Sequence, residues 1–533
     1  MAFRKQPLTI FIIAVAIFLL TSILPVCYML AQFIINLLQE PSASSSPFLE
    51  SRQLILLGRS LSIAVFATLV ALALGLPSAI ALAAKDLPFR KLFYLLILIP
   101  LLIPPYIMAG AWIHLLASDG FVNRSIAAIF GPSARLSVFS QTGCVWCLGL
   151  SHFPIIAIIL AAGLSKIDRN LQDIARLSTG RWGVFRHSTL PQILPHLAAS
   201  ICLVMIFVLG RYGVPSLLGI NTYPVEIFAQ FSAFYDENAA IATALPLIVL
   251  VVILILLQRH LMLNRSYASI TPSSESGNPI SLRKFKYYAV ALLLALFVIT
   301  VLLPFASVLS YIGNLTKIGN TLVQYSSGIL ITSCLAFLAA ILSMLIALPI
   351  GFHLAHYKNR AGWLLDVICW LPIAIPGTIV GLGLINLGNL APTVRNADSF
   401  GILLLLAYIG MFSAFSIRIF QAAYKQADPN IAEAATVDSC KWFQRIFYID
   451  VPIHSESIAA AFIIVFVLTI GELNATVLLV PPGKETLAVT IDNLLHYGAN
   501  VKASVLCLAE AALVVLMVSL GFLLWHIGKG RKL

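Results

Sequence analysis

The chain has 533 residues, of which 60% are hydrophobic and only 10% are charged. Soluble domains carry about a quarter charged residues, so this composition excludes an ordinary soluble protein and indicates a polytopic membrane protein. No polar stretch is long enough to fold as a separate soluble domain, so any ATP-hydrolysing or ligand-capturing domain is expected on another chain. The net charge of +12 does not indicate nucleic-acid binding, because Lys and Arg fall mostly in short loops between apolar runs, where they act as topology signals.

Apolar runs of about 20 residues, enough to cross a hydrocarbon core of about 30 Å, recur along the chain. The first run follows Arg4 and Lys5 and is too long for the apolar core of a signal peptide, so we interpret it as a retained span. Basic residues between the runs predict that both termini are cytoplasmic. Twelve membrane spans are predicted, near 8–38, 60–84, 92–116, 143–165, 194–212, 239–258, 287–311, 325–355, 363–388, 400–424, 454–475 and 504–526.

The two halves of the chain resemble each other. Three prolines of the first half have partners 272 residues later, which pairs Pro77, Pro100 and Pro104 with Pro349, Pro372 and Pro376. Proline opens a backbone hydrogen bond and bends a helix, so these prolines are expected to shape their spans. We predict a first six-span repeat at 1–258, a cytoplasmic linker at 259–286 and a second six-span repeat at 287–533. Both repeats are predicted to cross the membrane in the same sense, so they should be related by a pseudo-two-fold axis along the membrane normal.

Two polar, charged segments interrupt the apolar pattern, one in each half. The one in the second half, at residues 431–452, is called the second polar segment. Glu433 stands near a predicted helix start, where an acid suits the helix dipole, and Ala434 and Ala435 provide a small-residue face. Pro452 breaks the chain before the next span. A short helix, a small face for close docking and polar groups that fix the register are what a contact with a soluble motor requires.

The first polar segment, at 171–191, is related to the second and contains Asp173, Ala175 and Pro191 at matching positions. One such loop alone would be interpreted as a solvated loop with ordinary helix caps. An acid, an alanine, a tryptophan and a proline that recur in both halves favour a function instead. Basic residues crowd both segments, so we expect both on the cytoplasmic side.

The second polar segment resembles the coupling loop of binding-protein-dependent ABC importer permeases, in which Glu-Ala-Ala is followed by a small residue and then by a proline that opens the next span. Ser439 stands where glycine is usual in that family. The first polar segment fits more loosely, with Thr179 at this position and Gly180 one place beyond. The resemblance covers nearly the whole chain. It implies an all-α membrane protein of the type I ABC importer class, with 12 transmembrane helices in two parallel six-helix repeats.

The resemblance implies a non-catalytic permease subunit of an ATP-driven importer in the bacterial inner membrane. The implied partners are a homodimer of ATP-binding subunits, docked on the two polar segments, and a solute-binding protein on the periplasmic face. The sequence lacks a GxxxxGK[ST] phosphate loop, so ATP and Mg²⁺ are expected on the partner ATPase and no cofactor on this chain. Closure of the ATPase dimer on ATP would then shift the permease between inward-open and outward-open states.

The segment at 471–499 is similar to that of fused permeases of the ferric-iron type, as is its first-half counterpart at 213–219. Ferric iron is therefore the predicted solute, with thiamine and 2-aminoethylphosphonate as alternatives, because those permeases share the fused layout. The sequence shows no metal site: His114 and His152 stand singly in apolar spans, and Cys144 and Cys147, the one cysteine pair at ligand spacing, lack a second half. Selection of iron is expected largely in the separate binding protein.

Charges inside the predicted spans are functional candidates, because isolated charges are costly in a membrane. Arg211 and Glu472 occupy equivalent positions at the outer ends of the fifth and eleventh spans. They either face each other as part of an outer gate or pair separately with nearby polar groups. Glu510, in the last span, is a second possible partner for Arg211, although a hydrogen bond between helices is its more expected role. Both carboxylates would suit a cation.

A secondary transporter driven by an ion gradient is the alternative from a different class, because parallel repeats of six spans also occur there. Such a transporter would not need two matched cytoplasmic segments. A membrane enzyme is less consistent with the sequence, because no convergent set of acid, base and nucleophile appears.

Overall fold

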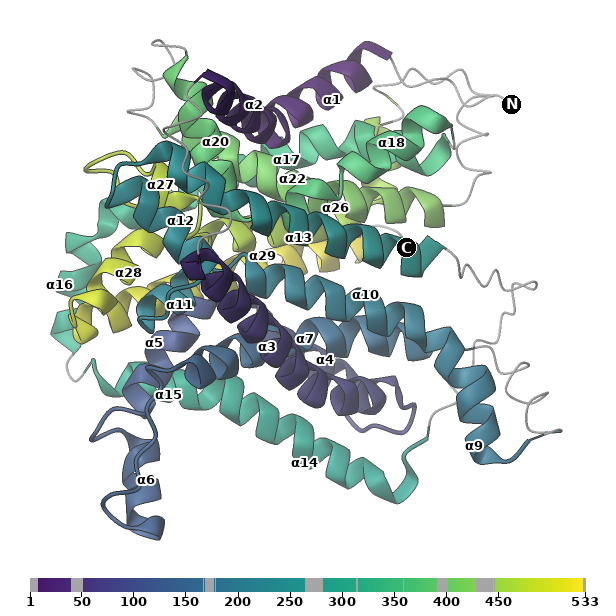
Figure 1. The fold of residues 1–533 in the computed structure, drawn as a ribbon. Coiled ribbons are helices and arrows are strands. Elements are labelled where there is room, and N and C mark those ends of the chain that lie inside the picture. Colours follow the sequence, from purple (N-terminus) through teal and green to yellow (C-terminus); the bar gives the residue numbers. More distant parts are fainter. Residues whose placement is uncertain are drawn as a thin grey trace. The chain divides into compact units, whose positions relative to one another are not determined.

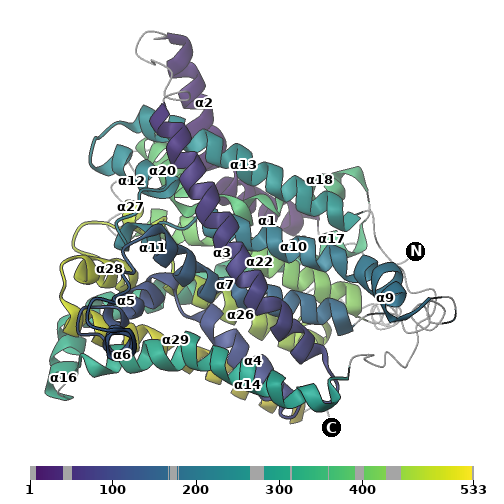
Figure 2. The ribbon, with the colours of Figure 1, turned by 60° about the horizontal axis from the view of Figure 1, so that its bottom comes forward.

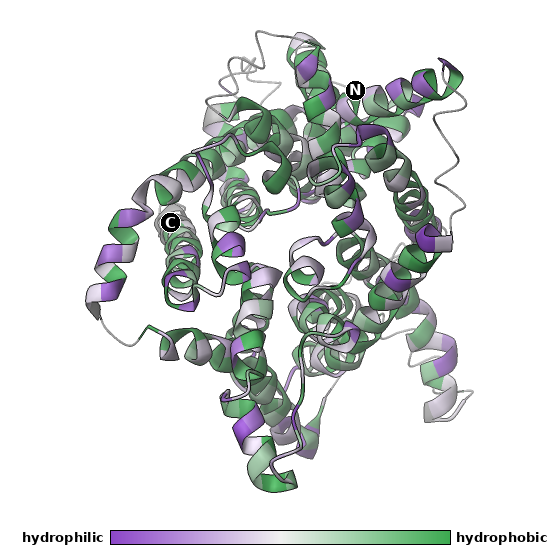
Figure 3. Ribbon diagram, turned by 60° about the vertical axis from the view of Figure 1, so that its left-hand side comes forward, coloured by the Kyte–Doolittle hydropathy of each residue, from purple (hydrophilic) through white to green (hydrophobic). Residues whose placement is uncertain are grey.

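The structure, a computed structural model, describes residues 8–39, 51–165, 167, 177, 179–263, 281–312, 315–357, 359–390, 401–427, 444 and 446–530. These residues are helical almost throughout and contain no strand. Hydrophobic residues predominate along the helices, as a membrane environment requires (Figure 3). The predicted all-α membrane class is therefore confirmed.

The chain divides into two compact units. The first unit holds the described residues within Phe48–Glu226 and Thr243–Gly313, and the second those within Met1–Pro47, Ile227–Ala242 and Asn314–Leu533. Two helices, α12 (Tyr223–Ser232) and α13 (Glu237–Leu263), contribute residues to both units.

The other helices of the first unit are α3 (Ser51–Ala83), α4 (Arg90–Leu102), α5 (Pro105–Leu115), α6 (Phe121–Phe130), α7 (Gln141–Ser165), α9 (Arg181–Val184), α10 (Leu190–Leu209), α11 (Gly213–Leu217), α14 (Lys286–Phe297) and α15 (Leu303–Ser310) (Figure 1). A π-helical turn, η2 (Phe185–Thr189), joins α9 to α10, and another, η4 (Val298–Leu302), joins α14 to α15. The short 3₁₀ turn η3 (Arg283–Phe285) precedes α14.

The helices of the second unit are α1 (Leu8–Ser22), α2 (Leu24–Gln39), α16 (Leu315–Gln324), α17 (Ser326–His356), α18 (Arg360–Ile368), α19 (Leu371–Ala374), α20 (Gly377–Asn389), α22 (Ile402–Gln426), α25 (Val451–Ile453), α26 (Ser455–Ile470), α27 (Thr476–Leu479), α28 (Leu487–His496) and α29 (Asn500–Gly530). The π-helical turn η6 (Ile446–Asp450) precedes α25.

The same three-helix packing occurs in both units. In the first unit α3 packs along α7, and α10 packs against both. In the second unit α17 packs along α22, and α26 packs against both (Figure 2). Because α3, α7 and α10 are followed in the same chain order by α17, α22 and α26, the packing reproduces the predicted parallel repeat.

The first helices of the two halves are exchanged between the units. The N-terminal helix α1 packs on α17 and α22, whereas α14, the first helix of the second half, packs on α3 and α4. The repeats predicted at 1–258 and 287–533 describe the chain order and stay a prediction. The compact units follow a different division, because each takes its first helix from the other half.

Close contacts hold α1 and α2 in the second unit. A Cβ added to Gly410 of α22 would lie 2.3 Å from the carbonyl oxygen of Thr21. The Ser22 hydroxyl donates a hydrogen bond of 2.8 Å to the carbonyl oxygen of Gly410. A Cβ on Gly383 of α20 would similarly lie 2.7 Å from backbone atoms of Pro25. The backbones of α1 and α22, and of α2 and α20, therefore approach as closely as only glycine permits.

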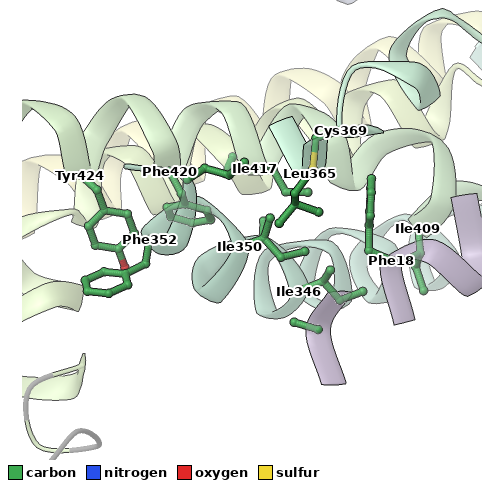
Figure 4. Packing of buried hydrophobic residues seen from close by; sticks show 14 residues of the cluster. Phe18, Ile346, Ile350, Phe352, Leu365, Cys369, Ile409, Ile417, Phe420 and Tyr424 are labelled. Atoms are coloured by element: carbon green, nitrogen blue, oxygen red, sulfur yellow. The ribbon is translucent and has the colours of Figure 1, made fainter. Parts of the chain in front are cut away.

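A buried apolar cluster fills the space between α1, α17, α18 and α22 (Figure 4). Phe18 of α1 is fully buried in it. Its neighbours in the cluster include Ile346, Ile350, Leu365, Cys369, Ile409 and Ile417. The exchanged helix therefore forms part of the core of the second unit.

Eight described helices are long and apolar enough to cross a membrane, or eleven if each bent pair counts as one span. The bent pairs are α1 with α2 (48°), α4 with α5 (89°), and the α18–α19 segment with α20 (104°). Three predicted spans, 8–38, 92–116 and 363–388, are thus sharply bent. The eleventh predicted span, 454–475, corresponds to the shorter apolar helix α26, which has 16 residues. All twelve predicted spans correspond to described helices, but not all are single straight helices.

Candidate functional site

Two matched prolines stand at two of the three sharp bends. Pro104 precedes α5 with φ −55° and ψ 134°, and Pro376 precedes α20 with φ −56° and ψ 140°. Each proline carbonyl accepts a hydrogen bond of 3.0 Å from the N–H three residues later, which belongs to Ile107 and Ile379. The offset of 272 residues found in the sequence therefore marks a repeated turn, and each turn leaves a helix N-terminus within its unit.

Glu472 lies against the N-terminus of α20 in the second unit. Its carboxylate is buried, and Oε1 accepts a hydrogen bond of 2.8 Å from the N–H of Ala475. A Cβ on Gly377, the first residue of α20, would lie only 2.7 Å from the same oxygen. The amide of Asn474 donates to Oε2 at 3.3 Å. The N-terminus of α20 and these donors surround the carboxylate with positive partial charges.

A chain of hydroxyl hydrogen bonds ties this site to α22. The Thr476 hydroxyl donates to the carbonyl oxygen of Glu472 at 2.7 Å. Because its only proton is used there, the Tyr408 hydroxyl donates to the Thr476 oxygen, at 2.8 Å. Tyr408 and Thr476 are buried, so the position of Glu472 is fixed from both α20 and α22.

Arg211 and Glu510 occupy separate places. Arg211 follows α10 in the first unit, and its N–H bonds the carbonyl oxygen of Val208. His152 of the same unit is buried in α7, and its Nδ1 lies 2.8 Å from the Leu148 carbonyl oxygen. Glu510 is fully buried in α29 of the second unit. Arg211 and Glu472 belong to different units, so their proposed pairing stays a prediction.

The acidic and small residues of the polar segments lie outside the described residues. These are Asp173, Ala175, Glu433, Ala434, Ala435 and Ser439. Thr179 and Gly180 of the first polar segment are described and exposed. The expected contact surface is therefore seen only at its C-terminal ends.

Both polar segments end in the same way. A five-residue π-helical turn, η2 in the first and η6 in the second, leads into the next helix. Pro191 and Pro452 occupy the second position of the helices that follow. The turns, like the prolines, are 261 residues apart. Single π-turns inside helices are frequent at functional sites, so the repeated turn supports a shared role for the two segments.

The two ends also differ. After η2 the chain continues without a break, so that Trp182–Leu209 passes as one span. After η6 the helix is interrupted at His454, between α25 and α26. Exposed aromatic side chains are found on both: Trp182, which is 70% exposed and stacks on Phe185, and Tyr448, which is 80% exposed. Exposed aromatic residues are typical of protein contact surfaces.

The sequence analysis missed one intramembrane ion pair. Arg418 of α22 lies 2.5 Å from the carboxylate of Asp366 of α18 and also donates to Gln421 at 2.8 Å. The guanidinium lies over the ring of Trp370, 4.4 Å from its centroid. The sequence could have indicated this pair, because Asp366 and Arg418 are charged residues within the predicted spans 363–388 and 400–424. Since the two charges satisfy each other, a structural role in holding α18 to α22 explains them.

A buried acid also lies on α28. Asp492 is 4% exposed, and His496 one turn later lies 3.6 Å from its carboxylate. Burial raises the pKa of Asp492, and the neighbouring His496 opposes this shift. Within the part of the chain that is described, no group of three or more His, Cys, Asp or Glu residues is placed to hold a metal ion.

Comparison with known proteins agrees with this architecture. Residues 53–264 and 347–528 each match the family model of the binding-protein-dependent transport system inner membrane component. The Fe(3+)-transport system permease protein FbpB 2 of Haemophilus influenzae is 23% identical over 446 residues, which cover 82% of this chain and 83% of that protein. The ferric transport system permease protein FbpB of Actinobacillus pleuropneumoniae is 22% identical over 498 residues, or 89% of this chain and 71% of that protein.

A shorter relative matches only part of the chain. The molybdenum transport system permease protein ModB of Haemophilus influenzae is 29% identical over 209 residues. This alignment covers 38% of the chain but 90% of that protein. A protein the size of one half thus aligns with a part of this chain that is about as long as one repeat.

Proposed function

Since this chain belongs to the family of binding-protein-dependent transport system inner membrane components, which it matches twice, we propose that it is the fused permease subunit of an importer of ferric iron. Iron is proposed as the solute because of how much of the chain aligns with relatives named for ferric transport. Relatives named for ferric transport align over 82% and 89% of the chain and so include both halves. The molybdenum relative aligns over 38%.

The two polar segments are the proposed contacts with a homodimer of ATP-binding subunits, which carry ATP and Mg²⁺. Each segment ends in a π-helical turn followed by a proline, and the chain then continues directly into α10 in the first half and through α25 into α26 in the second. A displacement of the segment is thereby transmitted to the helix that packs on α3 and α7, or on α17 and α22. ATP-driven closure of the partner dimer would shift the population between two access states by binding them with different affinity.

The difference between the two segments predicts unequal contacts. The first continues into one uninterrupted helix, whereas the second is separated from α26 by the break at His454. A rigid connection transmits motion directly, and an interrupted one allows α26 to tilt against its segment. We therefore expect the two ATPase contacts to be similar in kind but not in mechanical coupling.

Glu472 is the proposed pathway carboxylate. It is buried, accepts the N–H of Ala475 and is fixed between α20 and α22, near the bend formed by Pro376. A fixed carboxylate favours the passage of a cation over that of an anion. Ferric iron would be selected largely by a separate solute-binding protein on the periplasmic face, with Arg211 opposite Glu472 as part of an outer gate and both chain termini in the cytoplasm.

The coupling role is tested with Glu433→Lys in the full chain, expressed with its ATPase subunits and reconstituted in proteoliposomes. The substitution should abolish ATP-dependent uptake and leave the membrane helices folded, as judged by circular dichroism and monodisperse elution. Glu456→Lys is the matched control, because Glu456 is exposed and lies just beyond the segment, on α26. Unchanged uptake by the Glu433 variant would contradict coupling through this segment.

The solute is tested by uptake of radiolabelled ferric iron presented by the binding protein, in competition with molybdate, thiamine and 2-aminoethylphosphonate. Uptake of iron that requires ATP and resists ionophores is expected. Uptake that collapses with the ion gradient and is indifferent to ATP would instead support a secondary transporter. Uptake of one of the competitors in place of iron would keep the permease but change its solute.

A further inference from the structure

The segment between α5 and α7 folds as a fixed hairpin of α6 and residues 131–140. The buried amide of Asn123 holds it together. Its Nδ2 donates to the carbonyl oxygens of Leu116 (2.7 Å) and Leu136 (2.9 Å), and its Oδ1 accepts from the N–H of Leu136 (2.9 Å). Because the Asn123 side chain bonds both Leu116, at the end of α5, and Leu136, in the returning segment, the orientation of α6 relative to α5 is fixed.

One face of α6 is apolar, and it is partly exposed at Val122 and Ile126 and largely exposed at Ile129. Val122, Ile126 and Ile129 are spaced so that they share one face of the helix, and Arg124 lies on the opposite face. Ile129 is 75% exposed and Phe130 is 74% exposed. Helix amphipathicity of this kind requires an apolar environment on one side and water on the other.

The position of α6 indicates what that apolar environment is. The hairpin lies at the end of the first unit away from α9, where α5 ends and α7 begins (Figures 1 and 2). There it runs across the direction of α14 and extends beyond α5 and α15. A helix that leaves the bundle sideways at the ends of its membrane spans lies over the lipid that surrounds them.

The charges of the hairpin complement a lipid surface. Arg124 on α6 and Arg135 on the returning segment are both exposed. Exposed apolar side chains also continue along the returning segment, at Leu136 and Phe139, and onto the start of α7 at Trp146. Exposed apolar side chains thus occur along the hairpin and at the start of α7, a predicted span, together with two exposed basic groups. This combination of apolar and basic side chains suits a lipid surface that carries phosphate groups.

We propose that α6 is an interfacial lipid anchor. It lies in the leaflet at the membrane face opposite the first polar segment, with Ile129 and Phe130 at the boundary of the acyl chains and Arg124 and Arg135 near lipid phosphates. Because α6 follows α5 directly, the anchor holds the far end of the bent α4–α5 pair at the membrane surface. This role does not depend on which solute the permease carries.

The anchor is tested by nitroxide spin labels on the full chain in vesicles of phosphatidylglycerol and phosphatidylcholine. Cys27 and Cys334, which are exposed among the described residues, and Cys440, which lies outside them, are first replaced by serine. Labels are then placed at Ile129→Cys and, as the matched control on the opposite face, at Arg124→Cys. The label at 129 should collide with oxygen and be shielded from a water-soluble nickel complex, and the label at 124 should show the reverse.

Two outcomes would overturn the proposal. Equal exposure of both labels to the nickel complex would place α6 in water. Shielding of the 129 label from both oxygen and nickel would indicate a protein partner in place of lipid. The double variant Arg124→Gln/Arg135→Gln tests the basic groups. In the chain with both arginines, the label at 129 should lie deeper in the mixed membrane than in a membrane of phosphatidylcholine alone. In the double variant, the label should lie at the same depth in both membranes. An identical lipid dependence in both chains would overturn the role of the arginines.

Discussion

Ser60 of α3 accepts a hydrogen bond of 2.9 Å from the N–H of Tyr223, the first residue of α12. In the second unit, Thr332 of α17 accepts the corresponding bond of 2.8 Å from the N–H of Leu487, the first residue of α28. Ser60 and Thr332 are 272 residues apart, like the paired prolines. A buried hydroxyl thus positions a short helix on the same side of each repeat.

Loss of either hydroxyl should therefore destabilise the protein by a similar amount. Ser60→Ala and Thr332→Val each leave a buried N–H without its partner, which costs about 1 to 3 kcal/mol in the free energy of unfolding. Thermal unfolding of the purified chain in detergent measures this. Ser125→Ala on α6 is the matched control, because its hydroxyl bonds only its own helix, at Phe121. Effects no larger than that of the control would contradict the shared role.

The crossing of α1 and α22 predicts that Gly410→Ala is destabilising. The new methyl group would lie 2.3 Å from the backbone oxygen of Thr21, so the helices must separate, which costs about 1 to 3 kcal/mol. Gly58→Ala is the matched control, because nothing lies within 4 Å of its added Cβ, and it should be neutral or stabilising by up to about 1 kcal/mol. If the two variants melted alike, the close packing of α1 on α22 would be wrong.

The ion pair of Asp366 and Arg418 predicts a pattern of rescue. Both side chains are mostly buried, so Asp366→Leu or Arg418→Met alone strands a charge and should lower the free energy of unfolding by about 3 kcal/mol. The double variant removes both charges and should recover most of the loss. A double variant as unstable as the sum of the two single ones would show that the charges act independently.

A capping contact of Asp86 predicts pH-dependent stability. Its carboxylate, in the loop between α3 and α4, accepts the N–H groups of Leu282 (2.9 Å) and Arg283 (2.7 Å) at the start of η3. The bond from Leu282 contributes most to lowering the pKa of Asp86 below its ordinary value of 3.8. A carboxyl with a lowered pKa stabilises the fold above its unfolded pKa and loses that contribution as the pH falls through its folded pKa.

The difference in melting temperature between the parent chain and Asp86→Asn should accordingly be constant near neutral pH and vanish when the pH falls well below 3.8. Thermal unfolding from pH 7 downwards measures it. Asp119→Asn is the matched control, since Asp119 is exposed on the turn before α6. Equal effects of the two substitutions at every pH would contradict the capping role.

The proposed gate predicts compensation between charges. Arg211→Glu and Glu472→Arg should each lower ATP-dependent uptake by roughly tenfold or more, and the combined reversal should restore part of it. Glu485→Arg is the control, because Glu485 is exposed near the start of α28. Two independent losses that do not compensate each other would favour separate partners for Arg211 and Glu472 and would remove the gate from the proposed mechanism.

Features with a local cause could be predicted from the sequence. The turns at Pro104 and Pro376 follow from the fixed φ of proline and its missing N–H, so equal spacing in the sequence gave equal geometry. The number of apolar runs followed from their length and hydrophobicity. The size of the bends did not, because an 89° or 104° angle depends on what surrounds the helices.

Features with a distant cause could not be predicted. Nothing in α1 distinguishes packing on α17 from packing on α3, because both offer apolar faces of similar length. The contact depends on Gly410 and Gly383, which are far away in the sequence. The link from Tyr408 through Thr476 to Glu472 was equally hidden, since it joins two helices through a hydroxyl that carries no recognisable pattern.

The exchange of first helices has a consequence for biogenesis. The ribosome delivers α1 and α2 first, yet their packing partners α17, α20 and α22 are synthesised only after the whole first half. The second unit therefore cannot finish folding until most of the chain has been inserted. Until then α1 remains in the lipid without its packing partners, whereas domains usually fold in their order of synthesis. Were the two halves made as separate proteins, each compact unit would lack the first helix that packs on it until the two halves met. Fusion into one chain ensures that α1 and α14 are made in the same molecule as the units on which they pack.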